Sequence, residues 1–351
     1  MSVASFAPRV GRQPPPRWTH RWRWWPRRRR RRLRVRLARA HTCALVALLA
    51  IIVPHSAGAA AAGQERVLVV LATPGPTPYT VASVDRTMRA ADAFLRTASL
   101  GHLRLHTEVT PWLAAFSGDP GCGGLTRESF EALLAPARVA AARAGYEPSR
   151  YTEVIYALAD SHCGFQGEAW GHQVLLTRRP TLSLVVHELG HTFGLAHAQA
   201  SDCVVPPARC GIDDTGDPFS PMGSGMLDFS AYEKANLGWI QPQPQVRSGQ
   251  RYLLAVPTFR TTLPQALVID TTAGRCWIEY RSEPFRGLLV RFVTPRQTAT
   301  PFAAPTVLIL NPTKAGRPWI APGETYQIPG SFLATLLHAG TTQAQIRLFH
   351  G

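Results

Sequence analysis

The chain has 351 residues, enough for one large or two ordinary domains, with 38 basic and 22 acidic side chains and a formal net charge of +16. This charge is confined to one end, because residues 1–40 contain 14 arginines and no acidic residue, which leaves 24 basic and 22 acidic side chains in the rest. A body so close to neutral offers no basic face for phosphate groups, so the composition excludes nucleic acid as a partner.

The first 62 residues have the order of a secretory signal. Arginines fill residues 27–32, an apolar run follows at residues 43–53, and small residues suited to cleavage occupy residues 57–62. The apolar run is too short for a comfortable membrane-spanning helix of about 20 residues. We therefore expect residues 1–62 to be an arginine-rich leader and signal segment, and the protein to be secreted. An uncleaved membrane anchor, with the rest of the chain outside the cell, is the alternative.

Strand-like and helix-like segments alternate in the first globular part of the chain. An unbroken apolar run favours a strand buried on both faces, a 3.6-residue period favours a helix, and strict alternation favours a half-exposed strand. Thr126 and Gly145 are suited to begin and end a helix over residues 126–144. The alternation of elements predicts an α/β sheet. The patterns predict strands at residues 66–71, 102–109 and 152–158, and helices at residues 81–98 and 126–144.

Residues 187–197 read His-Glu-Leu-Gly-His-Thr-Phe-Gly-Leu-Ala-His and are the strongest chemical signal in the chain. His187 and His191 are four residues apart, so a helix puts both rings on one face, where one zinc ion can accept both. Gly194 is suited to end that helix with a positive φ, which allows His197 to approach as a third ligand. Three protein nitrogens leave a fourth tetrahedral position for water, as in catalytic rather than structural zinc sites.

Glu188 follows the first histidine, and from there its carboxylate can lean over the metal without binding it. A zinc ion in this site lowers the pKa of a bound water and polarises a carbonyl group. Glu188 is then suited to accept the proton of the water and to deliver it to a departing amine. The pattern predicts a zinc-dependent hydrolase. A structural zinc site and a buried helix with incidental histidines are the weaker interpretations.

The histidine pattern resembles the zinc signature of the metzincin metallopeptidases, which carry a methionine in a tight turn below the metal. Met222 is the candidate for it, because Pro221 and Gly223 on either side favour a turn. More narrowly, the chain resembles the gametolysin family. That likeness rests on Cys163-Gly164, Gly167, Ala198, Gly216-Asp217-Pro218, residues 236–239, residues 277–281 and residues 287–291.

This resemblance implies a metzincin-like catalytic domain at residues 63–240 and a secreted zinc endopeptidase that cuts peptide bonds of extracellular or surface proteins. The implied cofactor is Zn²⁺ held by His187, His191 and His197, with Glu188 as the general base, and the implied partner is a protein or peptide substrate. Two other functions stay open: a zinc-containing binding or adhesion module with little turnover, and a zinc hydrolase of non-peptide amides. The intact glutamate argues against the first of these.

Three further residues are weaker candidates for the chemistry. Some metzincins have a tyrosine two residues after the turn methionine as an extra metal ligand, whereas this chain has Ser224. The group that stabilises the oxyanion is therefore not identified, and Tyr232 is a weak candidate. His162 and His172 lie in the glycine-rich residues 161–172, which we expect to form the rim of the cleft, where an edge strand holds an extended peptide. Loop histidines are more often merely exposed.

Five of the six cysteines lie after the signal segment. Cys203 and Cys210 are close enough to close a loop, and Cys122 and Cys163 are candidates for a second pair, which leaves Cys276 odd. Disulfides suit an exported protein, although spacing alone does not determine the pairing.

Aspartates surround the cysteine loop and the methionine turn. Ca²⁺ prefers carboxylate and carbonyl oxygens, so a calcium site is one interpretation of this group. A solvated acidic loop is the other, and it is the one we favour. The residues are Asp202, Asp213, Asp214, Asp217 and Asp228.

Beyond residue 240 the pattern changes. Residues 241–245 alternate glutamine with proline and predict an extended linker. Short β-type runs after it predict a second domain at residues 246–351, a small antiparallel β-sandwich. Glu279 and Arg281 read as a solvated face, because alternating charges on a strand usually face water. The predicted fold is an α/β, or α+β, metzincin-like domain followed by this sandwich. The predicted strands are residues 252–256, 266–270, 276–280, 288–293, 306–310 and 343–348.

Overall fold

The computed structural model describes most of the chain after the predicted signal segment. Residues 1–62 lie outside the described residues, so the predictions made for them stay predictions. The described part is a mixed α/β structure with several sheets and few helices, in agreement with the predicted class. None of its helices is long and apolar enough to span a membrane. The described ranges are residues 63–118, 121–122, 126–159, 163–202, 211–243, 246–271, 274–293, 303–313, 316–328 and 332–350.

The first part of the chain builds a five-stranded sheet. Its strands are β1 (Gly63–Thr73), β2 (Leu103–Ala114), β3 (Glu153–Leu158), β4 (Gly167–Trp170) and β5 (Gln173–Leu176). The spatial order is β2-β1-β3-β5-β4. All neighbours pair in parallel except β4, which pairs antiparallel with β5 at one edge. The three predicted strands are present, and the predicted glycine-rich rim contains the edge strand β4.

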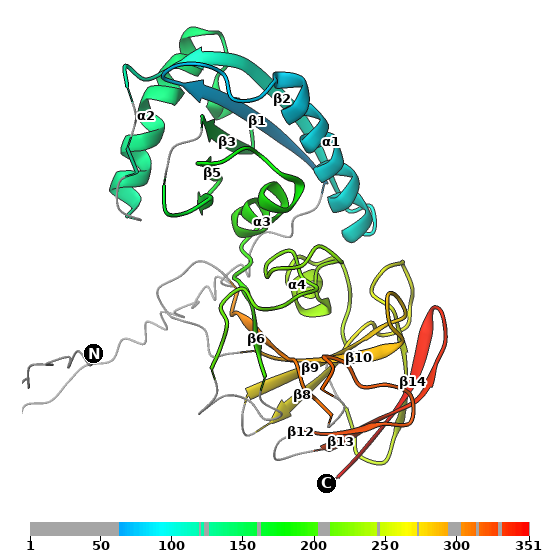
Figure 1. Cartoon of the computed structure of the whole chain (residues 1–351). Helices are drawn as coiled ribbons and strands as arrows, with labels where there is room; N and C mark the ends of the chain where they lie inside the picture. The colour runs from blue at the N-terminus through cyan, green and yellow to red at the C-terminus, as the bar shows by residue number, and fades with distance from the viewer. Residues whose placement is uncertain are drawn as a thin grey trace, which may run out of the picture. The chain divides into compact units, whose positions relative to one another are not determined.

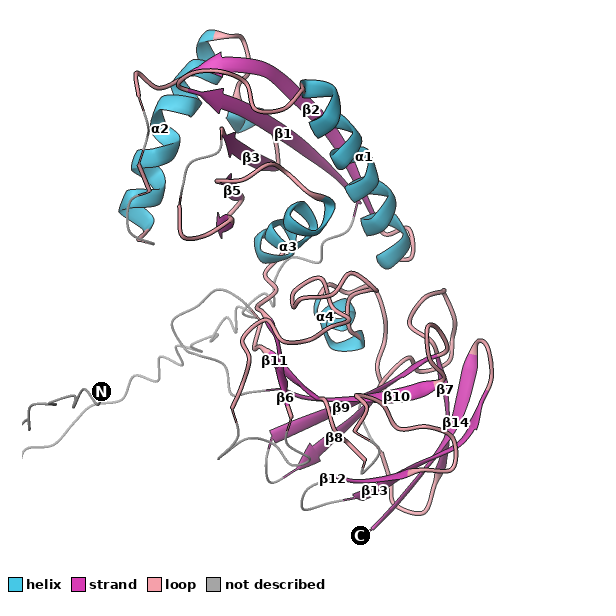
Figure 2. Ribbon diagram, viewed as in Figure 1, coloured by secondary structure: helices cyan, strands magenta, loops and turns pink. Residues whose placement is uncertain are grey.

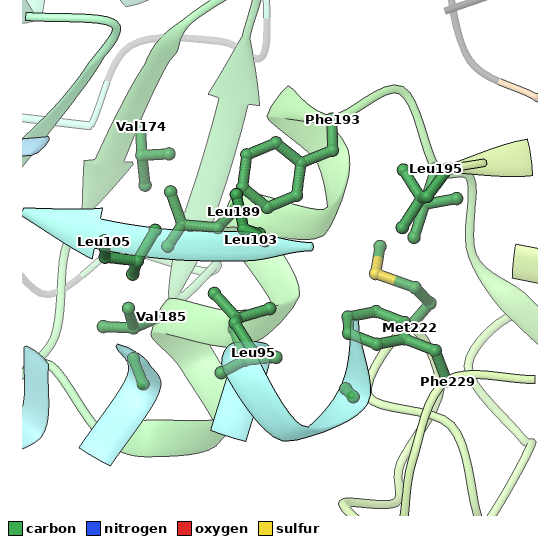
Figure 3. Packing of buried hydrophobic residues seen from close by; sticks show 14 of the residues in the cluster. Leu95, Leu103, Leu105, Val174, Val185, Leu189, Phe193, Leu195, Met222 and Phe229 are labelled. Carbon is green, nitrogen blue, oxygen red and sulfur yellow. The ribbon is translucent and has the colours of Figure 1, made fainter. Parts of the chain in front are cut away.

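Helices cover both faces of this sheet (Figures 1 and 2). The helices α1 (Val81–Ala98) and α3 (Leu182–Thr192) pack with the odd-numbered apolar residues of β1. The helix α2 (Arg127–Arg143) packs with the even-numbered ones. The central strand β1 is therefore buried on both faces, as its unbroken apolar run predicted. Figure 3 shows part of the first cluster, in which side chains from α1, α3 and β2 meet.

The two helices predicted in this part have the expected boundaries. The first spans the predicted residues 81–98, and α2 begins directly after Thr126, whose hydroxyl accepts a hydrogen bond from the Ser129 backbone N–H. Gly145 follows the end of α2 with a φ of 89°. Helix caps and glycine stops depend on neighbouring residues alone, which is why the sequence located these boundaries.

Two further sheets are built by the second half of the chain. Their strands are β6 (Ala198–Ser201), β7 (Arg251–Ala255), β8 (Leu267–Thr271), β9 (Gly274–Arg281), β10 (Gly287–Val293), β11 (Thr306–Ile309), β12 (Thr325–Ile328), β13 (Phe332–Ala339) and β14 (Gln343–His350). One sheet has the order β6-β11-β10-β9-β8 and the other the order β12-β13-β14-β7. Side chains from both sheets share one buried apolar cluster, which includes Ile278, Val290 and Ile346. The sequence predicted all of these strands except β6, β12 and β13.

One sheet extends across the predicted linker. The strand β6 lies before residue 240, yet it pairs in parallel with β11, which lies after residue 246. The predicted division into residues 63–240, 241–245 and 246–351 stays a prediction about folding units. The structure adds that backbone hydrogen bonds join the two predicted domains.

The prediction of a solvated face at Glu279 and Arg281 is wrong. Each residue is only 3% exposed, and Arg281 Nε donates to Glu279 Oε1 at 3.0 Å. The helix α4 (Ala231–Asn236) and the loop before it cover this face of β9, since the Ala231 N–H bonds to Glu279 and the Phe229 carbonyl accepts from Arg281. The two charges therefore pair with each other in the interior instead of meeting water.

Candidate metal centre

The helix α3 carries two of the predicted ligands and the predicted base. It begins after Thr181, whose hydroxyl accepts a hydrogen bond from the Leu184 backbone N–H. Its apolar face packs against the five-stranded sheet, which fixes the rotation of the helix about its axis. His187, Glu188 and His191 are thereby held in a fixed relation to the strands.

The chain reverses direction at Gly194, where φ is 89°. The Leu195 N–H donates to the Gly190 carbonyl at 3.0 Å, a bond that closes the end of the helix. Only a residue without a side chain adopts this conformation readily, so the glycine allows the turn that the sequence predicted. The turn brings His197 back toward the helix.

The three predicted ligands lie together. Their ligand nitrogens are all within 4.8 Å of one another, and His187 Nε2 lies 3.2 Å from His191 Nε2. The ring centroid of His197 is 5.3 Å from that of His187 and 4.9 Å from that of His191. Within the described residues, this is the one group of three or more histidine, cysteine, aspartate or glutamate side chains arranged to hold a metal ion.

Each histidine is oriented by a hydrogen bond at its Nδ1 atom. His187 Nδ1 bonds to the Pro221 carbonyl and His191 Nδ1 to the Leu195 carbonyl, both at 2.8 Å. His197 Nδ1 bonds to the carboxylate of Asp214. Carbonyl and carboxylate oxygens accept hydrogen bonds and cannot donate them, so each Nδ1 carries the proton. The lone pair of each ring is then on Nε2, which is the arrangement that metal-binding histidines adopt.

This arrangement fits a metal ion. Two nitrogens that bind one tetrahedral ion at 2.0–2.1 Å are roughly 3.3 Å apart, close to the separation of 3.2 Å between His187 Nε2 and His191 Nε2. Lone pairs at this distance repel each other unless a cation lies between them. Burial lowers the pKa of His187 and lowers that of His191 to about 3, so these rings are neutral ligands near neutral pH. Neutral imidazole suits zinc, copper, iron or nickel.

Glu188 lies beside the histidines and is 4% exposed. Its Oε2 atom is buried and has no hydrogen-bond partner among the described residues. Burial, together with the negative charge of Glu168 on β4, raises the pKa of Glu188 to about 8. A buried carboxylate oxygen without a partner is unfavourable in a protein interior and is typical of sites that receive a ligand.

A cleft of about 350 Å³ lies beside His187 and Glu188. Its walls come from α3, from the start of β4 and from the loop around Met222. Gly167 makes the close approach of β4 possible, because a Cβ atom at that position would lie 2.5 Å from Glu188 Oε1. The lining residues are Gln166, Gly167, Ser183, Leu184, His187, Glu188, Thr215, Pro221, Gly223, Ser224 and Gly225.

Met222 lies in a turn that packs against α3. The turn is closed by a bond of 3.0 Å from the Gly223 N–H to the Ser220 carbonyl. Met222 is fully buried, and its Sδ approaches the helix so closely that a Cβ on Gly190 would lie 2.2 Å from it. Figure 3 shows this side chain with Leu195 and Phe229 in the same cluster. The predicted turn at Met222 is therefore present, and it packs against the helix that carries two of the predicted ligands.

Among the described residues, the five aspartates do not gather into a group of three or more side chains that could share a metal ion. Asp217 and Asp228 are buried, and they pair with Arg291 at 2.8 Å and with Lys234 at 2.6 Å. A solvated loop is therefore the wrong interpretation for these two. Asp214 is bonded to a histidine, and the remaining two are exposed. Side-chain cations balance the charge of these two buried aspartates.

Two of the weaker candidates, Tyr232 and His172, are not brought into the cleft. The Tyr232 hydroxyl donates to the Ala304 carbonyl at 2.9 Å, and Tyr232 does not line the cleft. His172 Nδ1 lies 2.9 Å from Glu153, and the His172 side chain is 75% exposed. His162 lies outside the described residues.

Sequence reasoning missed the oxygens that orient the ligands. Pro221 acts through its backbone carbonyl, which has no signature in the sequence. Asp214 follows His197 by 17 residues and read only as one member of an acidic group. An aspartate at that distance from a ligand would have been a signal only with knowledge of the path of the loop.

One predicted disulfide is present. Cys122 and Cys163 are bonded across a sequence separation of 41 residues, so they tie the segment before α2 to the segment before β4. Cys276 is a buried free thiol, as expected from the odd count. Cys203 and Cys210 lie outside the described residues.

A comparison with known protein families and with curated proteins found no match to this chain.

Proposed function

We propose that the protein is a secreted, zinc-dependent endopeptidase of the metzincin type, similar to the gametolysin family. One observation carries the proposal: three imidazole nitrogens converge beside a buried carboxylate oxygen, Glu188 Oε2, that has no partner among the described residues. A closed structural metal site has no need of a free carboxylate or of an adjoining cleft. A hydrolytic site needs both.

The proposed mechanism assigns a role to each side chain. His187, His191 and His197 hold the metal through Nε2, and their Nδ1 partners keep each ring in the required tautomer. A zinc ion in this position supplies a Lewis acid that lowers the pKa of water and polarises a carbonyl oxygen. Glu188 is ionised more readily beside a positive charge, accepts a proton from the attacking water on Oε2, and returns it to the departing amine.

The edge strand β4 favours a polypeptide substrate. Among the described strands β4 pairs with β5 alone, and Gly167 at its start lines the cleft. A free strand edge offers backbone donors and acceptors to an extended peptide. A small amide makes no use of such an edge. This is the reason for proposing peptide bonds rather than non-peptide amides as the substrate.

We infer that residues 63–240 form a metzincin-like catalytic domain, because a helix with two ligands, a glycine turn, a third ligand and a methionine turn follow one another in that order. We also infer that the two C-terminal sheets form a small β-sandwich, because their facing side chains share one apolar cluster.

Secretion is supported by the disulfide between Cys122 and Cys163, because such bonds persist in oxidising compartments and are rare in the cytosol. N-terminal sequencing of protein recovered from the culture medium tests it. A mature chain that begins near residue 63 is the expected result. Full-length protein found in the membrane fraction would favour the anchored alternative.

The activity is tested with purified residues 63–351 and casein as substrate. We expect about one zinc ion per chain, loss of cleavage on addition of a chelator, and recovery on addition of Zn²⁺. Glu188→Gln keeps the size and polarity of the side chain but cannot accept a proton, so it should retain zinc and lose cleavage by about 10²-fold or more. Glu283→Gln, an exposed position, is the matched control and should cleave normally.

The outcomes separate the rival functions. Cleavage by Glu188→Gln at the rate of the unmodified protein contradicts the mechanism. Zinc binding without cleavage of casein or of small amides indicates a binding or adhesion module. Cleavage of small acylated amines but not of casein indicates a hydrolase of non-peptide amides.

A further inference from the structure

Asp217 lies at the centre of the hydrogen bonds that shape the methionine turn. Its Oδ1 accepts from the Phe219 N–H at 2.9 Å and from the Ser220 N–H at 3.3 Å. Its own N–H donates to the Ala198 carbonyl at 3.2 Å, and its carbonyl accepts from the Ser224 N–H at 2.9 Å. One buried residue thus joins both ends of the turn to the strand β6.

The same turn contacts the surroundings of all three histidines. The Pro221 carbonyl bonds to His187 Nδ1, and Met222 packs against α3 at the residue before His191. The Met222 carbonyl accepts from the N–H of the residue that follows His197, at 2.8 Å. A displacement of the turn would therefore move the carbonyl that orients His187 and the carbonyl that holds the backbone next to His197. It would also move the side chain that packs against α3.

Arg291 of β10 holds the carboxylate of Asp217 from the opposite side. Its Nε and Nη2 atoms lie 2.9 and 2.8 Å from Asp217 Oδ2, and its Nη1 lies 2.8 Å from Glu279 Oε1. Asp217 is 0% exposed and Arg291 is 2% exposed. A guanidinium with two N–H groups on one carboxylate oxygen constrains the direction of the carboxylate as well as its charge.

Asp217 and Glu279 differ in the number of cations that pair with them. Glu279 also pairs with Arg281 at 3.0 Å, so it retains a cation without Arg291. Among the described residues, Arg291 is the one cation within ion-pair distance of Asp217. Removal of Arg291 would leave the Asp217 carboxylate buried and uncompensated, which is strongly unfavourable. The carboxyl group relieves this either by taking up a proton, which weakens its bonds to the turn, or by moving with the turn toward water.

We propose that Arg291 is a positioning residue of the metal centre, which acts through Asp217 on the methionine turn and so on His187 and His197. Arg291 follows Asp217 by 74 residues and belongs to the predicted second domain. The inference rests on metal binding by the three histidines, as the proposed function does, but it does not require peptide cleavage.

The test uses residues 63–351 with Arg291→Met, which keeps most of the side-chain volume and removes the charge. Zinc affinity is measured by competition with a chromophoric chelator, and the visible spectrum of the Co²⁺ form reports the geometry at the metal. Thermal unfolding of the metal-free protein shows at which temperature each variant is folded. We expect about a tenfold loss of zinc affinity and an altered Co²⁺ spectrum in the folded variant.

Two control variants separate positioning from general stability. Leu336→Ala opens a cavity in the cluster between the two C-terminal sheets, which contains no residue of the turn, so it should lower the unfolding temperature without changing zinc affinity. Arg275→Met removes an arginine from the neighbouring strand β9, where it pairs with Asp270 at the surface, and should change neither property.

Zinc affinity in the folded variants tests the positioning role of Arg291. Unchanged zinc affinity in folded Arg291→Met, or an equal loss in Leu336→Ala, overturns the proposal. If Arg291→Met does not fold, Arg291→Lys replaces it: weakened zinc binding supports the role, and affinity equal to that of the unmodified protein overturns it. An unmodified protein that binds zinc but cuts nothing contradicts the proposed function alone, whereas one that binds no zinc contradicts both.

Discussion

Each of the three histidines has one ring nitrogen bonded to an oxygen and the other directed toward its neighbours. For His197 the oxygen belongs to Asp214, whose other carboxylate oxygen accepts from Gln199 at 2.8 Å. Partial burial acts against ionisation of Asp214, but the bonds from Gln199 and His197 lower its pKa. A negative charge at this position makes the imidazole a stronger ligand and holds its tautomer.

Asp214→Asn should therefore weaken zinc binding by about 10- to 100-fold. The amide keeps the size of the side chain but loses the charge and can present its NH₂ group to the ring. Because the Asp214 side chain is 64% exposed, we expect little change in the stability of the metal-free protein. Chelator competition measures the affinity, with the exposed Asp270→Asn as the control. Equal affinities in the two variants would contradict the assigned role.

The buried carboxyl of Glu188 should also be visible in the stability of the metal-free protein. Its pKa is raised from 4.5 to about 8, mainly by burial. Between these two pH values the folded state holds a proton that the unfolded state releases, so the free energy of unfolding falls as the pH rises. Below this window the effect is absent, and above it the full destabilisation remains.

Glu188→Gln lacks this titration. We expect the metal-free variant to gain stability relative to the unmodified protein as the pH rises from 5 to 8, and to keep a constant advantage above that range. Urea unfolding in the presence of a chelator, at pH 5 and pH 9, measures the difference. A stability difference that is the same at both pH values would show that the carboxyl is not shifted.

At the scale of the elements, the helix α3 packs against two different neighbours, the five-stranded sheet and the methionine turn. Its apolar side packs against the sheet, while Gly190 lets the turn methionine approach the helix backbone. Glycine inside a helix costs about 1 kcal/mol relative to alanine. The close approach of Met222 offsets this cost, because it lets a buried side chain fill the space between the helix and the turn.

The sign of the change in the free energy of unfolding caused by Gly190→Ala tests this packing. Helix propensity alone predicts a gain of up to about 1 kcal/mol, but a Cβ atom would lie 2.2 Å from Met222 Sδ, and overpacking costs about 1–3 kcal/mol. We expect net destabilisation by roughly 1–2 kcal/mol. A double-mutant cycle with Met222→Ala, followed by urea unfolding, should show that the two changes are coupled. Additive effects would indicate that the two residues do not meet.

For the whole molecule, the connection between the two predicted domains is the feature with the largest consequence. The strand β6 pairs with β11 across the predicted linker, and the cation that balances Asp217 lies on β10. The region that holds the three histidines is therefore stabilised in part by residues beyond 246. A chain cut at the linker would lose both the strand partner and the ion pair.

A fragment of residues 63–240 is accordingly expected to lack cooperative thermal unfolding and tight zinc binding, whereas residues 63–351 should show both. The reason is that β6 would have an unpaired edge and Asp217 would be buried without Arg291. Circular dichroism melting and chelator competition on the fragment and on the longer chain measure this. A fragment that folds and binds zinc as tightly as the longer chain would establish the linker as a true domain boundary.

Features that depend on neighbouring residues were predicted well. The spacing of His187 and His191, the positive φ of Gly194 and the cap at Thr126 each involve residues a few positions apart. The same holds for the apolar run of β1. Such features follow from helix geometry, backbone sterics and hydrophobic periodicity, which a sequence displays directly.

Features that depend on distant residues were missed or misread. Glu279 and Arg281 looked like a solvated face because the sequence does not show that α4 covers them. The bond from Asp214 to His197 and the pairing of β6 with β11 were equally hidden. The burial of a charged side chain and the identity of its partner are properties of the folded chain. The same carboxylate is stable when it is unpaired in water, and it is also stable in the interior when it pairs with a cation. The sequence therefore determined which atoms can bind a metal, and the packing determined which oxygens and charges hold them in position.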